Sequence, residues 1–169
     1  MQTIARRSFV TAAALVAATL AGCGSTSDAS APAAATLTVK DPWVKAVDKG
    51  MTAAFGTLVN DTGQDVTVVK AATSISPMEL HEMAMQDGKM VMRPKEGGFV
   101  VKAGGTHELA PGGDHLMIMD PSAPIKPGDE LRFTLTLGDG GTVQFTAVAK
   151  PFTGAGESYA PSAAPMAGM

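Results

Sequence analysis

Two histidines and two methionines near the middle of the chain have the side chains of a soft metal site: His81, Met92, His115 and Met117. Imidazole nitrogen and thioether sulfur are both neutral donors. Together they favour Cu(I) over harder ions such as Mg²⁺ and Ca²⁺, which prefer oxygen. Thioethers are also not lost to disulfides in an oxidising compartment. The residue types therefore predict a Cu(I) site.

The two residue types are concentrated in one part of the chain. Seven of the eleven Met residues and all three His residues lie between Met78 and Met119. Taken singly, a strand Met is most often a packing residue, and a strand His is most often a surface or hydrogen-bonded residue. Their coincidence favours metal ligands. Met90 or Met119 could replace a member of the set, whereas His107 has no Met two positions away and is interpreted as exposed and structural.

A hairpin is predicted where the methionines are densest. Asp87-Gly88 is a preferred two-residue type I′ turn, and it separates two short extended segments. This register places Met85 opposite Met90 and Met83 opposite Met92. Because every second side chain of a strand lies on the same face, all four sulfurs would project from one side of the hairpin.

The histidines follow the same alternation. His81 falls on the methionine face of the hairpin, diagonal to Met92, where long side chains can share one ion. Residues 114–119 form a third extended segment. In it His115 and Met117 share one face, and the Leu and Ile beside them take the other face, which we expect to be the core.

The rest of the chain is also extended. Apolar residues alternate with polar ones over residues 131–137 and 143–147, and further extended runs cover residues 54–59 and 66–72. Turn signals separate these runs at residues 60–63, 126–129 and 139–141. Short strands of this kind without helical periodicity predict an all-β antiparallel sandwich or barrel. The stretch has roughly the length of one domain.

The N-terminal segment predicts export. Arg6-Arg7 precede an apolar run over residues 9–20, which is too short to cross a bilayer as a helix, so residues 1–22 are interpreted as a signal peptide. The run ends in Leu-Ala-Gly-Cys, which resembles a bacterial lipobox with Cys23 as the acylated residue. A signal-peptidase site with a coincidental Cys is the alternative. We expect a lipoprotein anchored to the outer face of the cytoplasmic membrane.

Composition divides the mature chain into three parts. Residues 23–35 and 153–169 are rich in small and polar residues and are predicted to be a disordered tether and a disordered tail, on either side of a domain over residues 36–152. Cys23 is the only Cys, so lipidation leaves no thiolate ligand. Removing residues 1–22 discards two Arg and changes the formal charge from -3 to -5. No basic block remains, which argues against nucleic acid as a partner.

Several motifs of the domain resemble the periplasmic copper chaperones of the PCuAC type. The motifs are residues 81–83, 90–94, 103–106, 111–119 and 126–129. The resemblance implies a cupredoxin-like antiparallel β-sandwich with Greek-key connections, and Cu(I) bound by the equivalents of His81, Met92, His115 and Met117. It also implies a copper acceptor, the dinuclear copper centre of cytochrome c oxidase subunit II. The spacing from Met92 to His115 is one residue longer than the family pattern, an insertion assigned to residues 95–98.

Other function classes fit the sequence less well. A blue-copper electron carrier requires a Cys thiolate beside two His, and the domain contains no Cys. No catalytic triad, phosphate loop or carboxylate pair stands out, so we expect a carrier and not an enzyme. We also expect the carrier to be a monomer. Two alternatives stay open. One is copper storage, with Met166 and Met169 supplying extra sites, and the other is a non-metal interaction lipoprotein with a Met-rich docking face.

Overall fold

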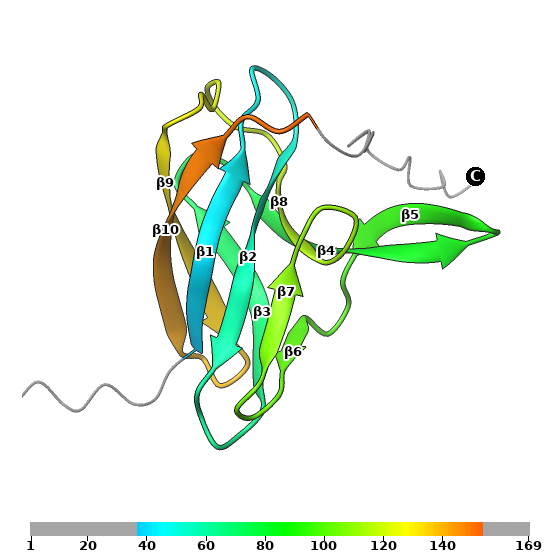
Figure 1. Ribbon diagram of the computed structural model, residues 1–169, viewed down its shortest axis with the longest axis vertical. Coiled ribbons are helices and arrows are strands. Elements are labelled where there is room, and N and C mark those ends of the chain that lie inside the picture. The colour runs from blue at the N-terminus through cyan, green and yellow to red at the C-terminus, as the bar shows by residue number, and fades with distance from the viewer. Residues whose placement is uncertain (1–36, 154–169) are drawn as a thin grey trace, which may run out of the picture. The chain divides into compact units, whose positions relative to one another are not determined.

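Residues 37–153 are described by a computed structural model, and these residues form ten strands (Figure 1). The strands are β1 (Leu37–Lys45), β2 (Thr52–Asn60), β3 (Val66–Thr73), β4 (Met78–Gln86), β5 (Lys89–Pro94), β6 (Phe99–Val101), β7 (Thr106–Leu109), β8 (His115–Ile118), β9 (Glu130–Leu137) and β10 (Thr142–Lys150). Within this range no helix is long and apolar enough to span a bilayer. The predicted signal peptide, Cys23, the tether and the tail beyond residue 153 lie outside the described residues.

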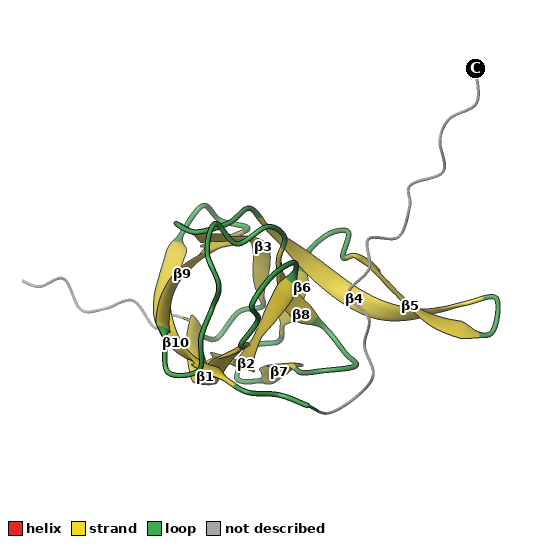
Figure 2. Cartoon of the chain, turned by 90° about the horizontal axis from the view of Figure 1, so that it is seen from above, coloured by secondary structure: helices red, strands yellow, loops and turns green. Residues whose placement is uncertain are grey.

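One hydrogen-bonded sheet contains the strands in the order β5-β4-β8-β2-β1-β10-β9-β3-β6, and β7 also pairs with β2. The sheet folds back on itself, so that β1 lies across the interior from β3 and β6 (Figure 2). The predicted all-β antiparallel sandwich is confirmed with one exception. Strands β1 and β10 pair in parallel, with Trp43 opposite Val148.

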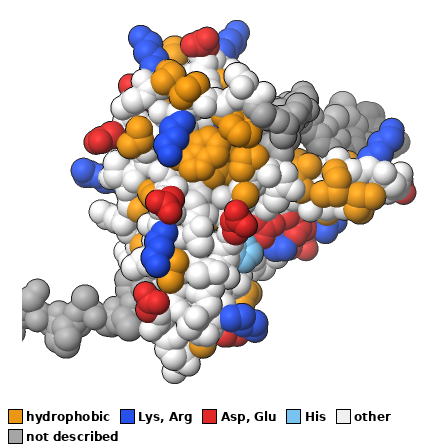
Figure 3. Space-filling model, viewed as in Figure 1, with side chains coloured by type: hydrophobic (Ala, Val, Ile, Leu, Met, Phe, Trp, Pro, Cys, Tyr) orange, Lys and Arg blue, Asp and Glu red, His pale blue; other side chains and the backbone are white. Residues whose placement is uncertain are grey.

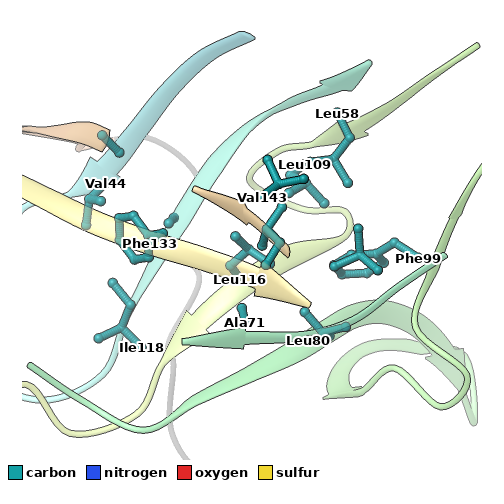
Figure 4. Packing of buried hydrophobic residues seen from close by; sticks show 14 of the residues in the cluster. Val44, Leu58, Ala71, Leu80, Phe99, Leu109, Leu116, Ile118, Phe133 and Val143 are labelled. Atoms are coloured by element: carbon teal, nitrogen blue, oxygen red, sulfur yellow. The ribbon is translucent and has the colours of Figure 1, made fainter. Parts of the chain in front are cut away.

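The core forms where the predicted alternation turns apolar side chains inward. Leu131, Phe133 and Leu135 of β9 are buried, while the polar residues between them are more exposed. Leu116 and Ile118 of β8 also enter the core, as the alternation predicts (Figure 4). Burial of these side chains removes apolar area from water and fixes which face of each strand points outward.

The hairpin of β4 and β5 extends beyond the sandwich as an arm (Figures 1 and 2). Its turn has φ of 51° at Asp87 and 78° at Gly88, as a type I′ turn requires. The predicted register is confirmed: Met83 lies opposite Met92, and Met85 lies opposite Met90. Only the first part of β4 is paired with β8, so the outer part of the arm is a two-stranded ribbon.

The loop that follows the arm ends in a close backbone contact. Gly98 has a φ of +79°, and a Cβ placed on it would lie 2.1 Å from the carbonyl oxygen of Val68 in β3. Gly97 has nearly the same φ, +80°, but a Cβ there would meet nothing within 4 Å. The loop assigned to the family insertion therefore has space at Gly97 and none at Gly98.

This difference predicts that substitutions at the two neighbouring glycines lower the free energy of unfolding by unequal amounts. Both Gly97→Ala and Gly98→Ala place a side chain at positive φ, which costs about 1–2 kcal/mol. Gly98→Ala adds a backbone clash, and we expect it to lower the free energy of unfolding by about 2–3 kcal/mol more. Urea unfolding of the two variants measures the difference. Equal midpoints would show that the contact with Val68 is not a constraint.

Candidate metal centre

Three adjacent strands, β5, β4 and β8, carry the four predicted ligands. Register places His81 of β4 directly opposite His115 of β8, and the ring centroids lie 5.7 Å apart in an edge-on arrangement. His81, His115 and Met117 are 5%, 2% and 0% exposed, and Met92 is half-buried. Two imidazoles therefore face each other beneath the surface, at the point where the arm leaves the sandwich.

The ring of His115 is oriented by a backbone hydrogen bond. Its Nδ1–H donates to the carbonyl oxygen of Gly113 at 2.8 Å. In the neutral ring this leaves the lone pair on Nε2, which lies 3.3 Å from Sδ of Met92. Two lone-pair donors at this distance repel each other unless a proton or a cation lies between them. The pair is arranged as two ligands of one ion would be.

The ring of His81 is oriented by a carboxylate. Nε2–H donates to Oε2 of Glu79 at 2.8 Å, so the lone pair of the neutral ring is on Nδ1. Nδ1 is buried and has no hydrogen-bond partner among the described residues. A buried polar atom without a partner costs about 1–3 kcal/mol and calls for an explanation. A bound metal ion would satisfy this nitrogen.

The second sulfur comes from the same face of β8. Met117 is fully buried with Ala53 and Phe55, and Met92 packs against this cluster. Within residues 37–153 no three His, Cys, Asp or Glu side chains cluster as a metal site, and the candidate set is instead two imidazoles with two thioethers. This donor set fits a soft monovalent ion such as Cu(I).

An aromatic wall supports the centre, and the sequence did not reveal it. The distances between ring centroids are 6.3 Å from Phe55 to His115, 4.6 Å from Trp43 to Phe55, and 5.5 Å from Phe152 to Trp43. Apolar side chains gather on the surface over β1 and β2 (Figure 3). Glu79 was also missed, although it lies two positions before His81 and period-two alternation places both side chains on one face.

Three other residues considered in the sequence have clear positions. His107 was predicted to be exposed, and this is wrong: its side chain is 24% exposed, stacks on Phe99, and bonds Oδ2 of Asp114 at 2.9 Å. Met90 is 53% exposed and lies further out along the arm than Met92. Met119 packs against the cluster that contains Met117.

Charged residues occupy the opposite face of the arm. The carboxylate of Glu82 accepts hydrogen bonds from Lys95 Nζ and, at 2.9 Å, from Arg93 Nε. The hydrogen bond from Lys95 and then the one from Arg93 hold the pKa of Glu82 below its ordinary value of 4.5. The same contact with Glu82 raises the pKa of Lys95. These ion pairs connect β4 to β5 and to the loop that follows.

The lowered pKa predicts a pH-dependent contribution of Glu82 to stability. A carboxyl whose folded-state pKa is depressed stabilises the fold above its unfolded pKa, and this contribution is lost as the pH falls through the folded value. We therefore expect Glu82→Gln to melt below the parent protein at pH 7. The difference in melting temperature between the two proteins should disappear as the pH falls below about 4.5. Thermal melts across this range, with Glu96→Gln as the exposed control, test the prediction; a gap that is independent of pH would contradict it.

Comparisons with known proteins identify a family and a relative that this chain resembles. The family model "Putative lipoprotein LpqE-like" matches residues 37–149. A protein of Leifsonia xyli subsp. xyli (strain CTCB07), "Putative lipoprotein Lxx21020", is 42% identical over 123 residues, which are 72% of this chain and 74% of the relative.

Two solved structures show the fold. The apo PCuAC domain from PmoF1 is 19% identical with a TM-score of 0.56, over 68% of this chain and 93% of that domain. The solution structure of CuI-DR1885 from Deinococcus radiodurans is 29% identical with a TM-score of 0.52, over 71% of this chain and 83% of that protein. The predicted resemblance to PCuAC-type proteins and the cupredoxin-like β-sandwich are thus confirmed.

Proposed function

Because this chain belongs to the LpqE-like lipoprotein family and has the fold of PCuAC domains, we propose that it is an exported copper chaperone. It carries one Cu(I) ion as cargo, bound by His81, Met92, His115 and Met117. The solution structure from Deinococcus radiodurans is of the CuI form of that protein, which supports the choice of ion. The carrier acts as a monomer and catalyses no reaction.

One observation carries the proposal: each histidine has one ring nitrogen held by an oxygen, which supports the other nitrogen as the metal donor. Glu79 holds Nε2 of His81, and the Gly113 carbonyl holds Nδ1 of His115. Metal-binding histidines have this pattern, in which a hydrogen bond on one ring nitrogen orients the other nitrogen toward the ion. Glu79 also supplies one negative charge. A monovalent ion bound by four neutral ligands is thereby balanced without a thiolate.

The same donor set explains how the ion is released. Thioethers and imidazoles bind Cu(I) without charge, so an acceptor that offers cysteine thiolates binds the ion more tightly. Transfer is a ligand exchange in which each thiol of the acceptor loses its proton to water and the carrier returns to its neutral form. Copper remains Cu(I) throughout, and no electron is needed.

The acceptor in this proposal is the dinuclear copper centre of cytochrome c oxidase subunit II. A signal peptide over residues 1–22 directs export, and a lipid on Cys23 then holds the carrier on the outer face of the cytoplasmic membrane. An acceptor domain on the same face is met at a raised effective concentration, which speeds transfer without additional contacts.

The ligand assignment predicts a tight one-to-one complex that depends on each donor. We expect His115→Ala and Met117→Leu to weaken Cu(I) binding by at least about 100-fold, since each removes a ligand. Leu replaces Met at nearly constant volume, so Met117→Leu keeps the packing beside Phe55. The measurement is titration of the mature protein with Cu(I) against a competing chelator. Fluorescence of Trp43, the only Trp, gives a second signal close to the site.

Met78→Leu is the matched control for Met117→Leu. Met78 lies on the adjacent strand, but it packs against the main core on the other face of the sheet. We expect it to bind copper as the parent protein does. Unchanged binding in both His115→Ala and Met117→Leu would remove the ligand assignment.

If the protein delivers copper, transfer to an acceptor with thiolate ligands should run in one direction. When the loaded protein is mixed with the apo soluble domain of oxidase subunit II, copper should move to the acceptor. An acceptor whose ligand cysteines are replaced by Ser should take none. Copper that stays on the carrier, at more than one ion per chain, would instead favour storage.

A further inference from the structure

The outer part of the arm has a methionine face that the copper site described above does not use. Beyond His81, strand β4 pairs with β5 alone, so this ribbon has no third strand beside it. Two cross-strand pairs, Met83 with Met92 and Met85 with Met90, follow each other along one face. Only Met92 belongs to the proposed ligand set.

Packing does not explain the outer pair. Met85 and Met90 are 66% and 53% exposed, and the described residues do not cover them. The opposite face of the ribbon carries the Glu82–Arg93 ion pair, which is the kind of surface that keeps a projecting hairpin soluble. Two exposed thioethers placed directly opposite each other therefore have a cost in apolar exposure that burial against the sandwich does not offset.

The buried site requires a way in. His81, His115 and Met117 are at most 5% exposed, so an ion in water does not meet them directly. Met92 is half-buried, and its Sδ lies 3.3 Å from Nε2 of His115. Met83, directly opposite Met92, is half-buried as well. A row of methionine side chains therefore leads from the buried site outward along the arm.

We propose that Met85 and Met90, together with Met83, form a second and weaker Cu(I) site through which ions reach and leave the buried one. This inference rests on the proposed function. Directly opposite residues have Cβ atoms roughly 4.5–5.5 Å apart, so two flexible Met side chains can bring their sulfurs to one ion. Two or three thioethers form a soft site open to solvent, which favours Cu(I).

The step between the two sites is a short one. Successive pairs on one face of a strand are about 7 Å apart, twice the rise per residue. The ion exchanges the sulfurs of the outer pair for those of Met83 and Met92, and then adds the imidazoles of His81 and His115. All these ligands are neutral, so no proton or electron moves. The inner site is tighter because it adds two nitrogens and excludes water.

A titration with Ag(I), a soft monovalent ion without redox chemistry, tests the second site. The mature full chain is labelled with ¹³C at the Met methyl groups and followed by NMR. The first equivalent should shift the methyl signals of Met92 and Met117. The second equivalent should shift those of Met85 and Met90. The double variant Met85→Leu, Met90→Leu should keep the first response and lose the second.

Exchange kinetics give a second readout. In the double variant the affinity for the first Cu(I) should be unchanged, while loss of that ion to a competing chelator should slow by about tenfold, because the route has lost its outer ligands. Met166→Leu, Met169→Leu is the control for the C-terminal methionines, and it should behave as the parent protein does.

The two proposals fail in distinguishable ways. If the first equivalent of Ag(I) leaves Met92 and Met117 unshifted, the proposed function fails. If those signals shift but the second equivalent leaves Met85 and Met90 unshifted, the second site alone is overturned. Parental exchange rates in the Met85→Leu, Met90→Leu variant would likewise overturn its role as a route.

Discussion

The pairing of β4 with β8 is the constraint on which the candidate site depends. This register places His81 opposite His115, and on the other face it places Leu80 opposite Leu116 in the core. A slip of β4 by one residue would turn His81 inward and Leu80 outward, while His115 and Leu116 would stay in place because β8 also pairs with β2. Burial of the leucines is therefore what holds two imidazoles together on the opposite face of the sheet, beside the sulfurs of β5 and β8.

Within that frame, the hydrogen bonds of the histidines determine what the site can bind. Each ring has one nitrogen held by a carbonyl or carboxylate oxygen, which places the lone pair of the neutral ring on the other nitrogen. The thioethers add soft donors without charge, so an ion in the proposed site would be held by four neutral groups near one carboxylate, that of Glu79. Such a site can bind Cu(I) selectively and still release it to thiolates. Tight holding and easy release are compatible because the acceptor supplies the stronger ligands.

Local patterns in the sequence were sufficient to predict part of the fold and of the candidate site. The Asp87-Gly88 turn fixed the register of the arm, and alternation placed Leu116 and Ile118 in the core. Contacts between segments that are distant in the chain could not be predicted from these local patterns. The parallel pairing of β1 with β10, the aromatic wall next to His115 and the stacking that partly buries His107 all depend on strands brought together only by the complete fold. Glu79 could have been found, since it shares a strand face with His81.

X-ray absorption at the copper edge, on the mature protein loaded with one equivalent of Cu(I), reports the ligand atoms of the ion directly. We expect two nitrogen neighbours at about 2.0 Å, the usual metal–imidazole distance, together with two sulfur neighbours. In Met117→Leu one sulfur should disappear while both nitrogens remain. A first coordination sphere without nitrogen, or one of nitrogen and oxygen alone, would contradict a site built from His81, Met92, His115 and Met117.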